Sequence, residues 1–480
     1  MTTAAIKTAL RLAPSLRGEM IVPGHPAYDA ARAIDNHCSM SRPAAIVRCA
    51  DSADVAATVR FAAAEGLPLA IRAGGHSAAG FSSVEAGVVA DLRDINHVHV
   101  DAERRVVAIG GGALTGQVDR ATHPFGLATT TATVSTVGVA GFALSGGISY
   151  LTRKHGLGVD NLAGADVVLA DGSLARAGEG GDEDLLWALR GGGGNVGVVT
   201  ELRMRLHPLS VVTGGPMLFP LERAERLVRL YRDWIPQQAD DIYAFLALLT
   251  TPPDEAFPEE LRLRPVCALI WCNTAPENQS NAALATFRRE DPLLDLVRPM
   301  PYPALQSAFD AGAAAGKYGH LTGLLFEDLP DAAAAQFEPF GRSTPTPLCQ
   351  SHLYPLDGAA VRADSKDTAW PWRNAAFAQM FAAIAPAPGF DGGLRAWSAG
   401  FRDVLRPYAM PGCYANFQMD DGPEAARACY GTNAARLAEL KRRYDPGNVF
   451  RLNQNIVPAR RHPAGRSRHH WPGSGGAGIS

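Results

Sequence analysis

A histidine enclosed by small residues is the first side chain of the sequence that could do chemistry. In IRAGGHSAAGF, residues 71–81, His76 lies between Gly75 and Ser77, where an imidazole has little to pack against but can face a bound ligand. Glycine-rich loops of this kind bind anions through backbone N–H groups and need no lysine. The segment VSTVGVAGFALSGG at 134–147 has the same character. The two segments together predict a site for a diphosphate.

A third glycine-rich segment has a different predicted role. In GGGGNVG, Gly192, Gly194 and Gly197 satisfy the pattern GxGxxG. A Rossmann site requires a strand before this pattern and a helix after it. Here DEDLLWALRG is helical before the glycines, and VGVVTELRMRLHP alternates like a strand after them. The segment is therefore predicted to be a tight turn from helix to strand and not a nicotinamide site.

Length and composition limit the kind of protein. A chain of 480 residues with 47% apolar and 19% charged residues is globular and long enough for two or three domains. A net charge of −3 gives no field that would attract nucleic acid, and the apolar stretches are too short to span a membrane. Because the first 20 residues lack a signal peptide pattern, the predicted location is the cytoplasm.

The seven cysteines show neither a CxxC pair nor the spacing of a zinc site. We therefore expect buried thiols and no structural metal.

The elements that must position these residues follow from periodicity. Strands are predicted over 44–50, 67–75, 87–92, 97–100, 104–112, 263–273 and within 345–361, with helices from Ser52 to Gly66, over 182–191 and over 223–235. The last of these strands places His352 and Tyr354 on one face, because side chains two positions apart in a strand point the same way. The sequence after Arg460 is basic and nearly without apolar residues, so it is predicted to be disordered.

Four separate signatures, each of one or two short segments, resemble those of the berberine bridge enzyme-like flavoprotein oxidases, within the vanillyl-alcohol oxidase and p-cresol methylhydroxylase superfamily. They occur in the family's order between residues 42 and 456: RPAAIVRC with IRAGGHS, STVGVAGFALSGG with RKHGLGVDN, DLLWALRGGGGNVGVVT, and YANF with YDPGNVFRLNQNI. The resemblance implies an α+β, two-domain PCMH-type FAD-binding fold, with a middle α+β domain whose antiparallel sheet covers the flavin. The implied domains are 1–208 for FAD, 209–417 for substrate, 418–458 returning to the FAD domain, and a disordered tail at 459–480.

The cofactor that the resemblance implies is FAD bonded to His76. Many family members add a cysteine bond to the flavin, but Val134 occupies that position here, which implies attachment through the histidine alone. The family also links a small residue at the position of Val137 with access of O2 to the flavin. The alternative is that Val137 only packs in the core. The expected cofactor-binding residues are Arg72, Ala73, Gly74, Gly75, His76, Ser77, Gly80, Val134, Ser135, Thr136, Val137, Gly138, Gly141, Gly146, Gly147, Val198, Asn453 and Asn455.

The sequence departs from the family pattern at the residues expected to act as the catalytic base. Plant members often carry YxNY with the last tyrosine as base, but Phe417 stands there, and Ile148 replaces a second tyrosine that follows the glycine run. Removing a hydride from an alcohol needs a group that takes the O–H proton. We predict Tyr414 for this role, aided by Tyr354, with His352 as a further candidate. On an extended segment Tyr414 would face the flavin and Phe417 would face away.

The predicted function is an FAD oxidase that takes a hydride from an alcohol or amine carbon of a small secondary-metabolite-type substrate and passes the electrons to O2, forming H2O2. Three alternatives remain open. They are oxidation of an oligosaccharide at C1, a dehydrogenase with an acceptor other than oxygen, and a flavin-binding module without turnover.

Overall fold

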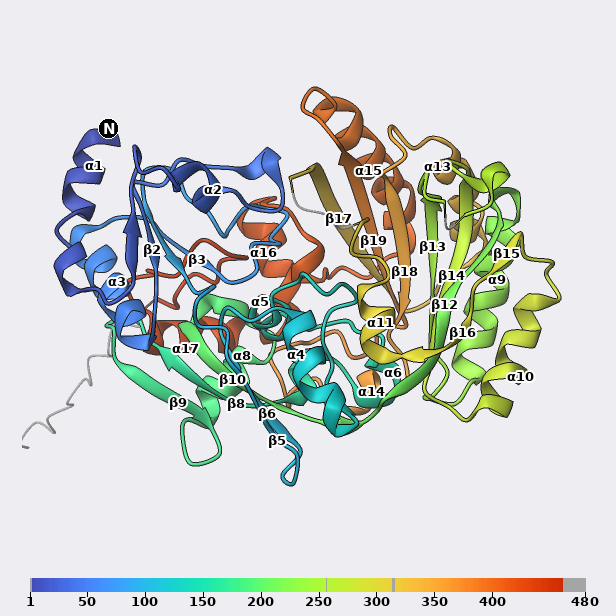
Figure 1. Cartoon of the computed structure of the whole chain (residues 1–480), viewed down its shortest axis with the longest axis horizontal. Helices are drawn as coiled ribbons and strands as arrows, with labels where there is room; N and C mark the ends of the chain where they lie inside the picture. The colour runs from blue at the N-terminus through green and yellow to red at the C-terminus, as the bar shows by residue number, and fades with distance from the viewer. Residues whose placement is uncertain (1, 256, 313–315, 461–480) are drawn as a thin grey trace, which may run out of the picture.

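The computed structural model describes residues 2–255, 257–312 and 316–460. Its N-terminal part contains two sheets, seen on the left of Figure 1. The first has the order β1-β2-β4-β3 and comprises β1 (Glu19–Ile21), β2 (Ala45–Arg48), β3 (Leu69–Arg72) and β4 (Val88–Asp91). The second has the order β5-β6-β10-β8-β9 and comprises β5 (Val98–Asp101), β6 (Val106–Gly110), β8 (Leu162–Val168), β9 (Leu174–Gly178) and β10 (Val198–Arg205).

A short pair, β7 (Leu127–Ala128) with β11 (His207–Pro208), precedes an eight-stranded sheet in which every pairing is antiparallel. Its order is β15-β12-β14-β13-β18-β19-β17, and β16 pairs with β12. The strands are β12 (Val211–Pro220), β13 (Ala244–Thr250), β14 (Pro265–Asn273), β15 (Leu294–Asp295), β16 (Arg298–Pro301), β17 (Tyr318–Phe326), β18 (Gln350–Pro355) and β19 (Phe377–Ala385). The fold is therefore α+β, as expected.

Helices surround these sheets. The first half contains α1 (Thr2–Ala9), α2 (Tyr28–Arg32), α3 (Ser52–Glu65), α4 (Thr115–Thr122), α5 (Val139–Leu144), α6 (Thr152–His155), α7 (Gly158–Asn161) and α8 (Glu183–Leu189). The second half contains α9 (Ala224–Trp234), α10 (Glu277–Arg288), α11 (Tyr302–Ser307), α12 (Asp331–Ala334), α13 (Phe337–Arg342), α14 (Ala359–Arg362), α15 (Asp391–Leu405), α16 (Pro423–Tyr430) and α17 (Ala434–Tyr444).

Helix α3 illustrates how local sequence sets the boundaries. The Asp51 carboxylate accepts hydrogen bonds from the N–H groups of Ala53 and Asp54, and Gly66 ends the helix with a φ of 64°. The helix, its predicted start and its glycine stop agree with the sequence analysis. The strands and helices predicted from periodicity are all present, with ends displaced by a few residues.

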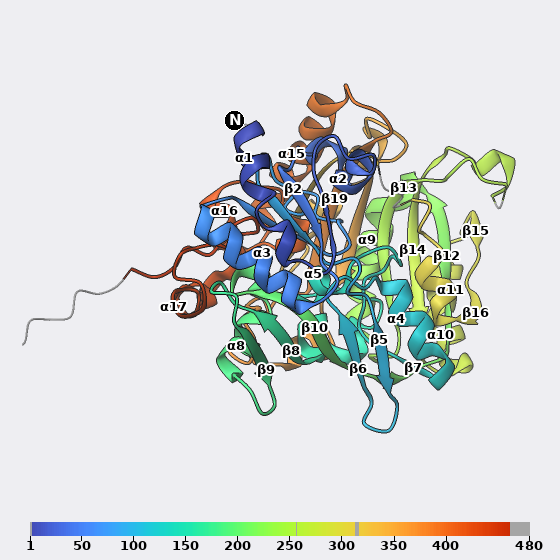
Figure 2. The same ribbon diagram turned by 60° about the vertical axis from the view of Figure 1, so that its left-hand side comes forward.

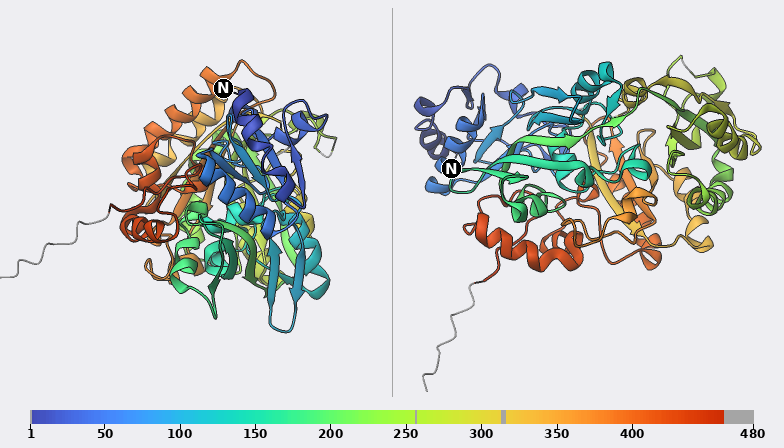
Figure 3. Two further views of the ribbon diagram at one scale, coloured as in Figure 1. Left: turned by 90° about the vertical axis from the view of Figure 1, so that its left-hand side faces the viewer. Right: turned by 90° about the horizontal axis from the view of Figure 1, so that it is seen from below.

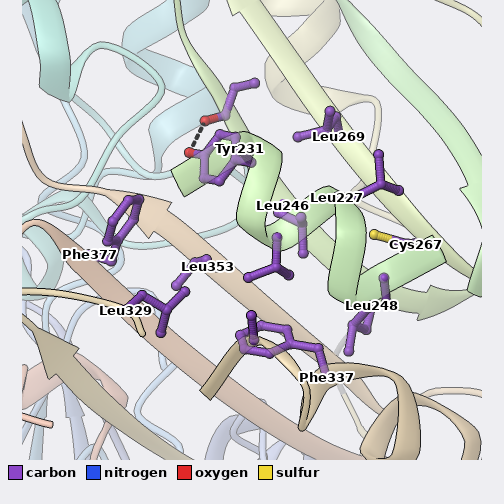
Figure 4. Close-up of a cluster of buried hydrophobic side chains, with 14 of the residues drawn as sticks. Leu227, Tyr231, Leu246, Leu248, Cys267, Leu269, Leu329, Phe337, Leu353 and Phe377 are labelled. Carbon is purple, nitrogen blue, oxygen red and sulfur yellow. Dashed lines mark hydrogen bonds between the residues drawn. The ribbon is translucent and has the colours of Figure 1, made fainter. Parts of the chain in front are cut away.

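Each face of the eight-stranded sheet has its own apolar layer. Alternate residues such as Leu246, Leu269 and Leu353 point to the outer face, where α9, α10, α13 and α15 cover them. Figure 4 shows part of this layer, including the hydrogen bond from the Tyr231 hydroxyl to the Ala244 carbonyl at 2.7 Å. The intervening residues, among them Tyr354, point toward the N-terminal half. This inner face forms a wall opposite the smaller sheets, and Figure 2 shows the large sheet lying beside them.

The chain returns to its N-terminal half after the large sheet. Helix α17 packs against α8, and Figure 3 shows the C-terminal helices beside the second sheet. The buried Lys441 ammonium joins the parts: it donates to the Asp445 carboxylate at 2.6 Å, to the Asn195 carbonyl at 2.7 Å and to the Phe450 carbonyl at 2.8 Å. We propose that the FAD domain ends at residue 208, the substrate domain at 417 and the returning segment at 458. The predicted disorder of the tail falls almost wholly on residues outside the described ranges.

The prediction of buried thiols is wrong for three cysteines. Cys413 and Cys429 form a disulfide with a Cα–Cα distance of 4.6 Å, because α16 brings its last turn back to the start of the segment. A separation of 16 residues carries no pairing signal in the sequence. Cys38 is exposed, and the remaining four described cysteines are buried thiols.

The Lys441 ion pair gives a test of this arrangement. Replacing Lys441 with Met leaves the Asp445 carboxylate buried without its partner, which costs about 3–5 kcal/mol in the free energy of unfolding. The exposed Arg442→Met variant, one residue further along the helix, should change it by less than about 0.5 kcal/mol. Chemical denaturation measures both, and equal effects would contradict the structural role of Lys441.

Candidate active site

A cavity of about 530 Å³ lies between the loops of the two smaller sheets and the inner face of the large sheet. This volume is typical of cofactor and ligand sites, which span roughly 300–1,000 Å³. The structure brings most of the predicted site residues to this one cavity. Those that line it are Ala73, Gly74, Gly75, His76, Ser77, Val134, Val137, Gly138, Gly141, Val198, His352, Tyr354, Tyr414 and Asn453.

The loop that carries His76 has backbone groups available for a ligand. It follows β3, and the N–H groups of Gly74, Gly75, His76 and Ser77 form no hydrogen bond with any other described residue. Successive unpaired N–H groups form a concavity that binds anions. Because these groups face a cavity, they fit the diphosphate that the sequence predicts.

Two glycines allow the predicted loops to meet. A Cβ atom on Gly74 would lie 2.4 Å from the backbone nitrogen of Gly138, and a Cβ on Gly138 would lie 2.5 Å from that of Gly74. No larger residue fits at either position without moving the backbone. A Cβ on Gly141 or Gly194, in contrast, would meet no atom within 4 Å, so the floor of the cavity is open there.

Buried polar atoms without partners give a second sign of a ligand. The Oδ1 atom of Asn453, which lines the cavity, is buried and has no hydrogen-bond partner in the described part of the chain. The same holds for Oδ1 of Asn455 and Oγ1 of Thr136, each next in sequence to a lining residue. Such groups are costly unless a ligand or water satisfies them. The open glycine floor, the unpaired N–H groups and these acceptors fit a cofactor such as FAD.

Some predicted cofactor residues lie outside the cavity. The Arg72 guanidinium is buried behind the loop, where it donates to the carbonyls of Ala31 and Ala33. Burial lowers the pKa of this guanidinium to about 10. Gly80 packs against Ser39, where a Cβ would lie 2.3 Å from the serine Cβ.

Five more predicted residues also do not line the cavity. The Ser135 hydroxyl and N–H both donate to the Asp310 carboxylate, at 2.5 and 2.9 Å, which fixes the loop from the side of the large sheet. Gly146 packs against the Tyr414 ring, and the Gly147 N–H donates to the Tyr414 hydroxyl. Thr136 and Asn455 are near in sequence to lining residues but do not line the cavity themselves.

Tyr414 is part of the cavity wall. Its hydroxyl oxygen accepts hydrogen bonds from the Gly147 N–H at 2.9 Å, the Ile148 N–H at 3.3 Å and the Asn416 side-chain amide at 2.9 Å. Three N–H donors match the three lone pairs of a phenolate, whereas a neutral phenol has only two. Burial raises the pKa of Tyr414, and these hydrogen bonds lower it and so offset part of the increase.

Packing holds the Tyr414 ring in place. The ring meets Trp370 edge-on, with centroids 5.2 Å apart, and Phe417 in the same way at 4.6 Å. A Cβ on Gly146, where φ is 137°, would come within 2.7 Å of the ring, so this glycine permits the close approach. The glycine run thus supports the tyrosine as well as the cavity.

The prediction of an extended segment around Tyr414 is wrong. Residues Ala415–Phe417 form a 3₁₀ turn, and the Phe417 N–H donates to the Tyr414 carbonyl at 2.8 Å. Phe417 therefore turns back onto Tyr414 and lines the cavity too. The turn also brings the Asn416 amide onto the Tyr414 hydroxyl, which spacing in a strand would not achieve.

His352 and Tyr354 share the inner face of β18, as alternation predicts. The Nδ1 atom of His352 is 2.7 Å from the Tyr354 hydroxyl, and its Nε2 atom is 3.0 Å from Oε1 of Gln350. Since Gln350 Oε1 can only accept, Nε2 carries the proton and Nδ1 accepts from Tyr354. The two side chains form a directed chain of hydrogen bonds beside Tyr414.

Sequence reasoning missed several lining residues. Asn195, in the segment predicted to be a simple turn, donates to the carbonyls of Gly192 and Gln454 and to the Tyr430 hydroxyl. The turn from α8 to β10 is present as predicted, but its residues also line the cavity. An asparagine directly after four glycines was the available signal. Asp35 and Lys317 were also missed, because nothing near them in sequence marks a site.

The described residues contain neither a metal site nor a membrane-spanning helix. No group of three or more His, Cys, Asp or Glu side chains among them could hold a metal ion. Within the same ranges, no helix combines the length and apolar character needed to cross a membrane.

Comparisons with known proteins agree with this geometry. Residues 43–178 match the family model described as FAD binding domain, and residues 413–457 match the model described as Berberine and berberine like. An FAD-linked oxidoreductase of Bacillus subtilis, YgaK, is 28% identical over 93% of this chain and 98% of its own. The (R)-6-hydroxynicotine oxidase of Paenarthrobacter nicotinovorans is 37% identical over 48% of this chain and 51% of its own.

Solved structures share the whole architecture. The 6-hydroxy-D-nicotine oxidase of Arthrobacter nicotinovorans matches with a TM-score of 0.82 and 26% identity, over 93% of this chain and 99% of its own. A xylooligosaccharide oxidase from Myceliophthora thermophila C1 matches with a TM-score of 0.81 and 21% identity, over 95% of this chain and 100% of its own. The latter likeness is one of fold.

The neutral state of His352 predicts a pH dependence of stability. Burial lowers its pKa to about 3, against about 6.5 in an unfolded chain. Between these values the unfolded chain binds a proton that the folded protein does not, so stability falls as pH falls. In His352→Gln, the loss of unfolding free energy from pH 6.5 to 4.5 should be smaller than in wild type by about 2 kcal/mol. The exposed His99→Gln variant should retain the wild-type slope, and an unchanged slope in His352→Gln would contradict the assignment.

Proposed function

This chain belongs to the berberine bridge enzyme-like FAD-linked oxidoreductases, and we propose that it is an oxidase that removes a hydride from a carbon bonded to oxygen or nitrogen in a small, largely apolar substrate. The observation that carries this proposal is the hydroxyl of Tyr414. It lies in the same cavity as the unpaired N–H groups around His76 and is held by three hydrogen-bond donors.

The residues for FAD come from three segments. Gly74–Ser77 would hold the diphosphate through backbone N–H groups, Val134–Gly138 would lie beside the ring system, and Asn453 would donate or accept at its edge. When bound, FAD accepts a hydride and later delivers the electrons to O2. We infer that His76 bonds the cofactor covalently and alone, because Val134 offers no thiol.

Tyr414 is the proposed base. Its donors favour the phenolate, and because the Ile148 N–H contact is long, at 3.3 Å, one lone pair remains to take the proton of a substrate hydroxyl or ammonium group. Tyr354 is the proposed second contact: its own proton is directed to His352, one lone pair of its oxygen meets the Thr133 side chain, and the other can accept a hydrogen bond from the substrate. Together they would orient the reacting carbon.

The part of the cavity beside the large sheet supports an apolar substrate. Its lining includes Leu321, Met380, Ala382, Ile384 and Phe417. Among the described lining residues the single carboxylate is Asp35, which stands beside His76 and not beside Tyr414. An oligosaccharide needs many polar partners, so a secondary-metabolite alcohol or amine suits this lining better.

Replacing the proposed base should stop reduction of the cofactor. In Tyr414→Phe the rate of anaerobic flavin reduction by substrate should fall by roughly 10²- to 10⁴-fold, the usual contribution of a general base. FAD content should be unchanged. Stopped-flow absorbance measures the rate. Tyr231→Phe, which removes a buried hydroxyl from the outer layer of the large sheet, serves as control and should reduce its flavin normally.

The same experiment has a pH arm. Because burial keeps the pKa of Tyr414 above its ordinary value of 10, the wild-type rate should rise with pH from 7 to 9.5 as the phenolate fraction grows. Tyr414→Phe should lose this rise. A variant that reduces its flavin at nearly the wild-type rate would move the role to Tyr354 and His352.

In this proposal, reoxidation of the reduced flavin by O2 depends on the side chain of Val137. Val137 lines the cavity and is only partly buried. Val137→Leu should slow reoxidation of the reduced enzyme by air and leave reduction by substrate nearly unchanged. The two half-reactions, measured separately by stopped flow, are each other's control. Equal slowing of both would assign Val137 to packing, and slow reoxidation of the wild type itself would favour a dehydrogenase.

Covalent attachment can be tested without a substrate. Acid-precipitated wild-type protein should stay yellow, and His76→Ala should release its flavin into the supernatant. The spectrum should show no thioether at flavin C6, since Val134 cannot form one. Release of flavin from the wild type would overturn the covalent bond, and a thioether spectrum would overturn the single attachment.

A further inference from the structure

Arg72 carries a buried positive charge that the proposed reaction does not use. The residue is 6% exposed and ends β3, shortly before the loop proposed for the diphosphate. Its guanidinium donates to the carbonyls of Ala31 and Ala33 at the end of α2, whereas its Nε atom is buried and has no hydrogen-bond partner among the described residues. Carbonyl oxygens satisfy donors, but they are uncharged and do not neutralise the cation.

The carboxylates near Arg72 are paired with other guanidinium groups. Asp91 on β4 is the register partner of Arg72, but its carboxylate accepts from Arg93 at 2.6 Å. The Asp94 carboxylate forms an ion pair with Arg48. Three guanidinium groups thus share two carboxylates, and within the described ranges Arg72 is the one of the three that has no ion pair of its own.

The surroundings of Arg72 disfavour its charge without removing it. Burial and the like charge of Arg93 lower the pKa of the guanidinium to about 10, although the Asp91 carboxylate acts in the opposite direction. An arginine with this pKa is still charged near neutral pH. A buried charge without a counter-ion is costly, because the protein replaces only part of the hydration that the charge gives up. The fold therefore maintains a cation at this position at a cost in stability.

The guanidinium lies directly against the loop that lines the cavity. A Cβ atom on Gly75, where φ is 80°, would be 3.3 Å from Nε of Arg72 and 3.5 Å from Nη2. Gly75 itself lines the cavity. One layer of backbone therefore separates the buried cation from the space in which a ligand would bind.

The cavity side of this loop offers little positive charge to an anion. Lys317 is the one lysine or arginine among the described lining residues, and its ammonium donates to the Gly312 carbonyl at 2.7 Å. The Asp35 carboxylate also acts on this ammonium and raises its pKa. The N–H groups of Gly74–Ser77 are neutral donors. A diphosphate in the loop would therefore find hydrogen bonds there but no unpaired cationic side chain of lysine or arginine.

We propose that Arg72 supplies the countercharge for the diphosphate of FAD from behind the Gly74–Ser77 loop, without touching it. This inference rests on the proposed place of the diphosphate in that loop. Opposite charges attract more strongly through protein than through water, because the effective dielectric constant of the interior is lower. Binding of FAD would compensate the buried charge, so Arg72 destabilises the flavin-free protein and strengthens its affinity for the cofactor.

The test measures reversible binding to the full-length chain that carries His76→Ala, so that no covalent bond hides the affinity. The flavin-free protein is titrated with FAD, with ADP, which has the diphosphate but no flavin, and with riboflavin, which has the flavin but no phosphate. In Arg72→Gln, whose amide can still donate to the carbonyls of α2, the dissociation constants for FAD and ADP should rise by roughly 10- to 100-fold, and that for riboflavin should not change. Arg72→Lys keeps the charge and should bind FAD within about threefold of the parent protein.

A matched control and a stability measurement separate charge from support of the loop. Arg48→Gln removes a guanidinium that Asp94 already pairs and that solvent partly screens, so FAD affinity should change by less than about threefold. Flavin-free Arg72→Gln should melt no lower than its parent, because the variant removes an uncompensated buried charge. A lower melting temperature together with weaker binding of riboflavin would assign Arg72 to support of the loop instead.

Three other results would overturn the role of Arg72 while the cofactor site stands. They are FAD affinity near the parent value in Arg72→Gln, equal losses in Arg72→Gln and Arg72→Lys, and an equal loss in Arg48→Gln. If ADP does not compete with FAD in the parent protein, the diphosphate lies elsewhere, and both this inference and the proposed cofactor site are wrong.

Discussion

The contact between the backbones of Gly74 and Gly138 is the constraint on which the site depends. It joins the loop after β3 to the loop before α5, and a side chain on either glycine would fall within 2.5 Å of the other backbone. With the two loops in contact, the unpaired N–H groups on one side and the small residues on the other form a single floor. A cofactor that bears phosphates can bind there because backbone, and not mobile side chains, supplies the donors.

Contacts across the cavity then position the large sheet over this floor. The Asp310 carboxylate holds Ser135 from beyond α11, and the Asn36 side chain bridges the His76 loop to the start of β17. Tyr414 forms a third link through the glycine run at 146 and 147. Tyr414, the proposed base, is therefore also one of the groups that hold the two halves together, which keeps its position fixed.

Much of this could be predicted from the sequence because the signals are local. The glycines around His76 and the alternation of His352 with Tyr354 depend only on neighbours, and the structure places them in one cavity. The 3₁₀ turn at Tyr414 and the disulfide between Cys413 and Cys429 could not be predicted, because both depend on contacts that are distant in sequence. The turn packs against β17 and bonds to the Phe142 carbonyl, and the disulfide forms where α16 folds back onto Cys413. Asp35 could not be predicted either, because His76, its neighbour in space, is 41 positions away in the chain.

A crystal structure of the FAD-loaded protein would test the account most directly. We predict density for the flavin in the cavity above Gly74 and Gly138, continuous with the His76 ring, with the Tyr414 hydroxyl facing the space where a substrate would meet the flavin. Density for FAD at another place, or a flavin ring screened from Tyr414 by the protein, would contradict the assignment of this cavity as the active site.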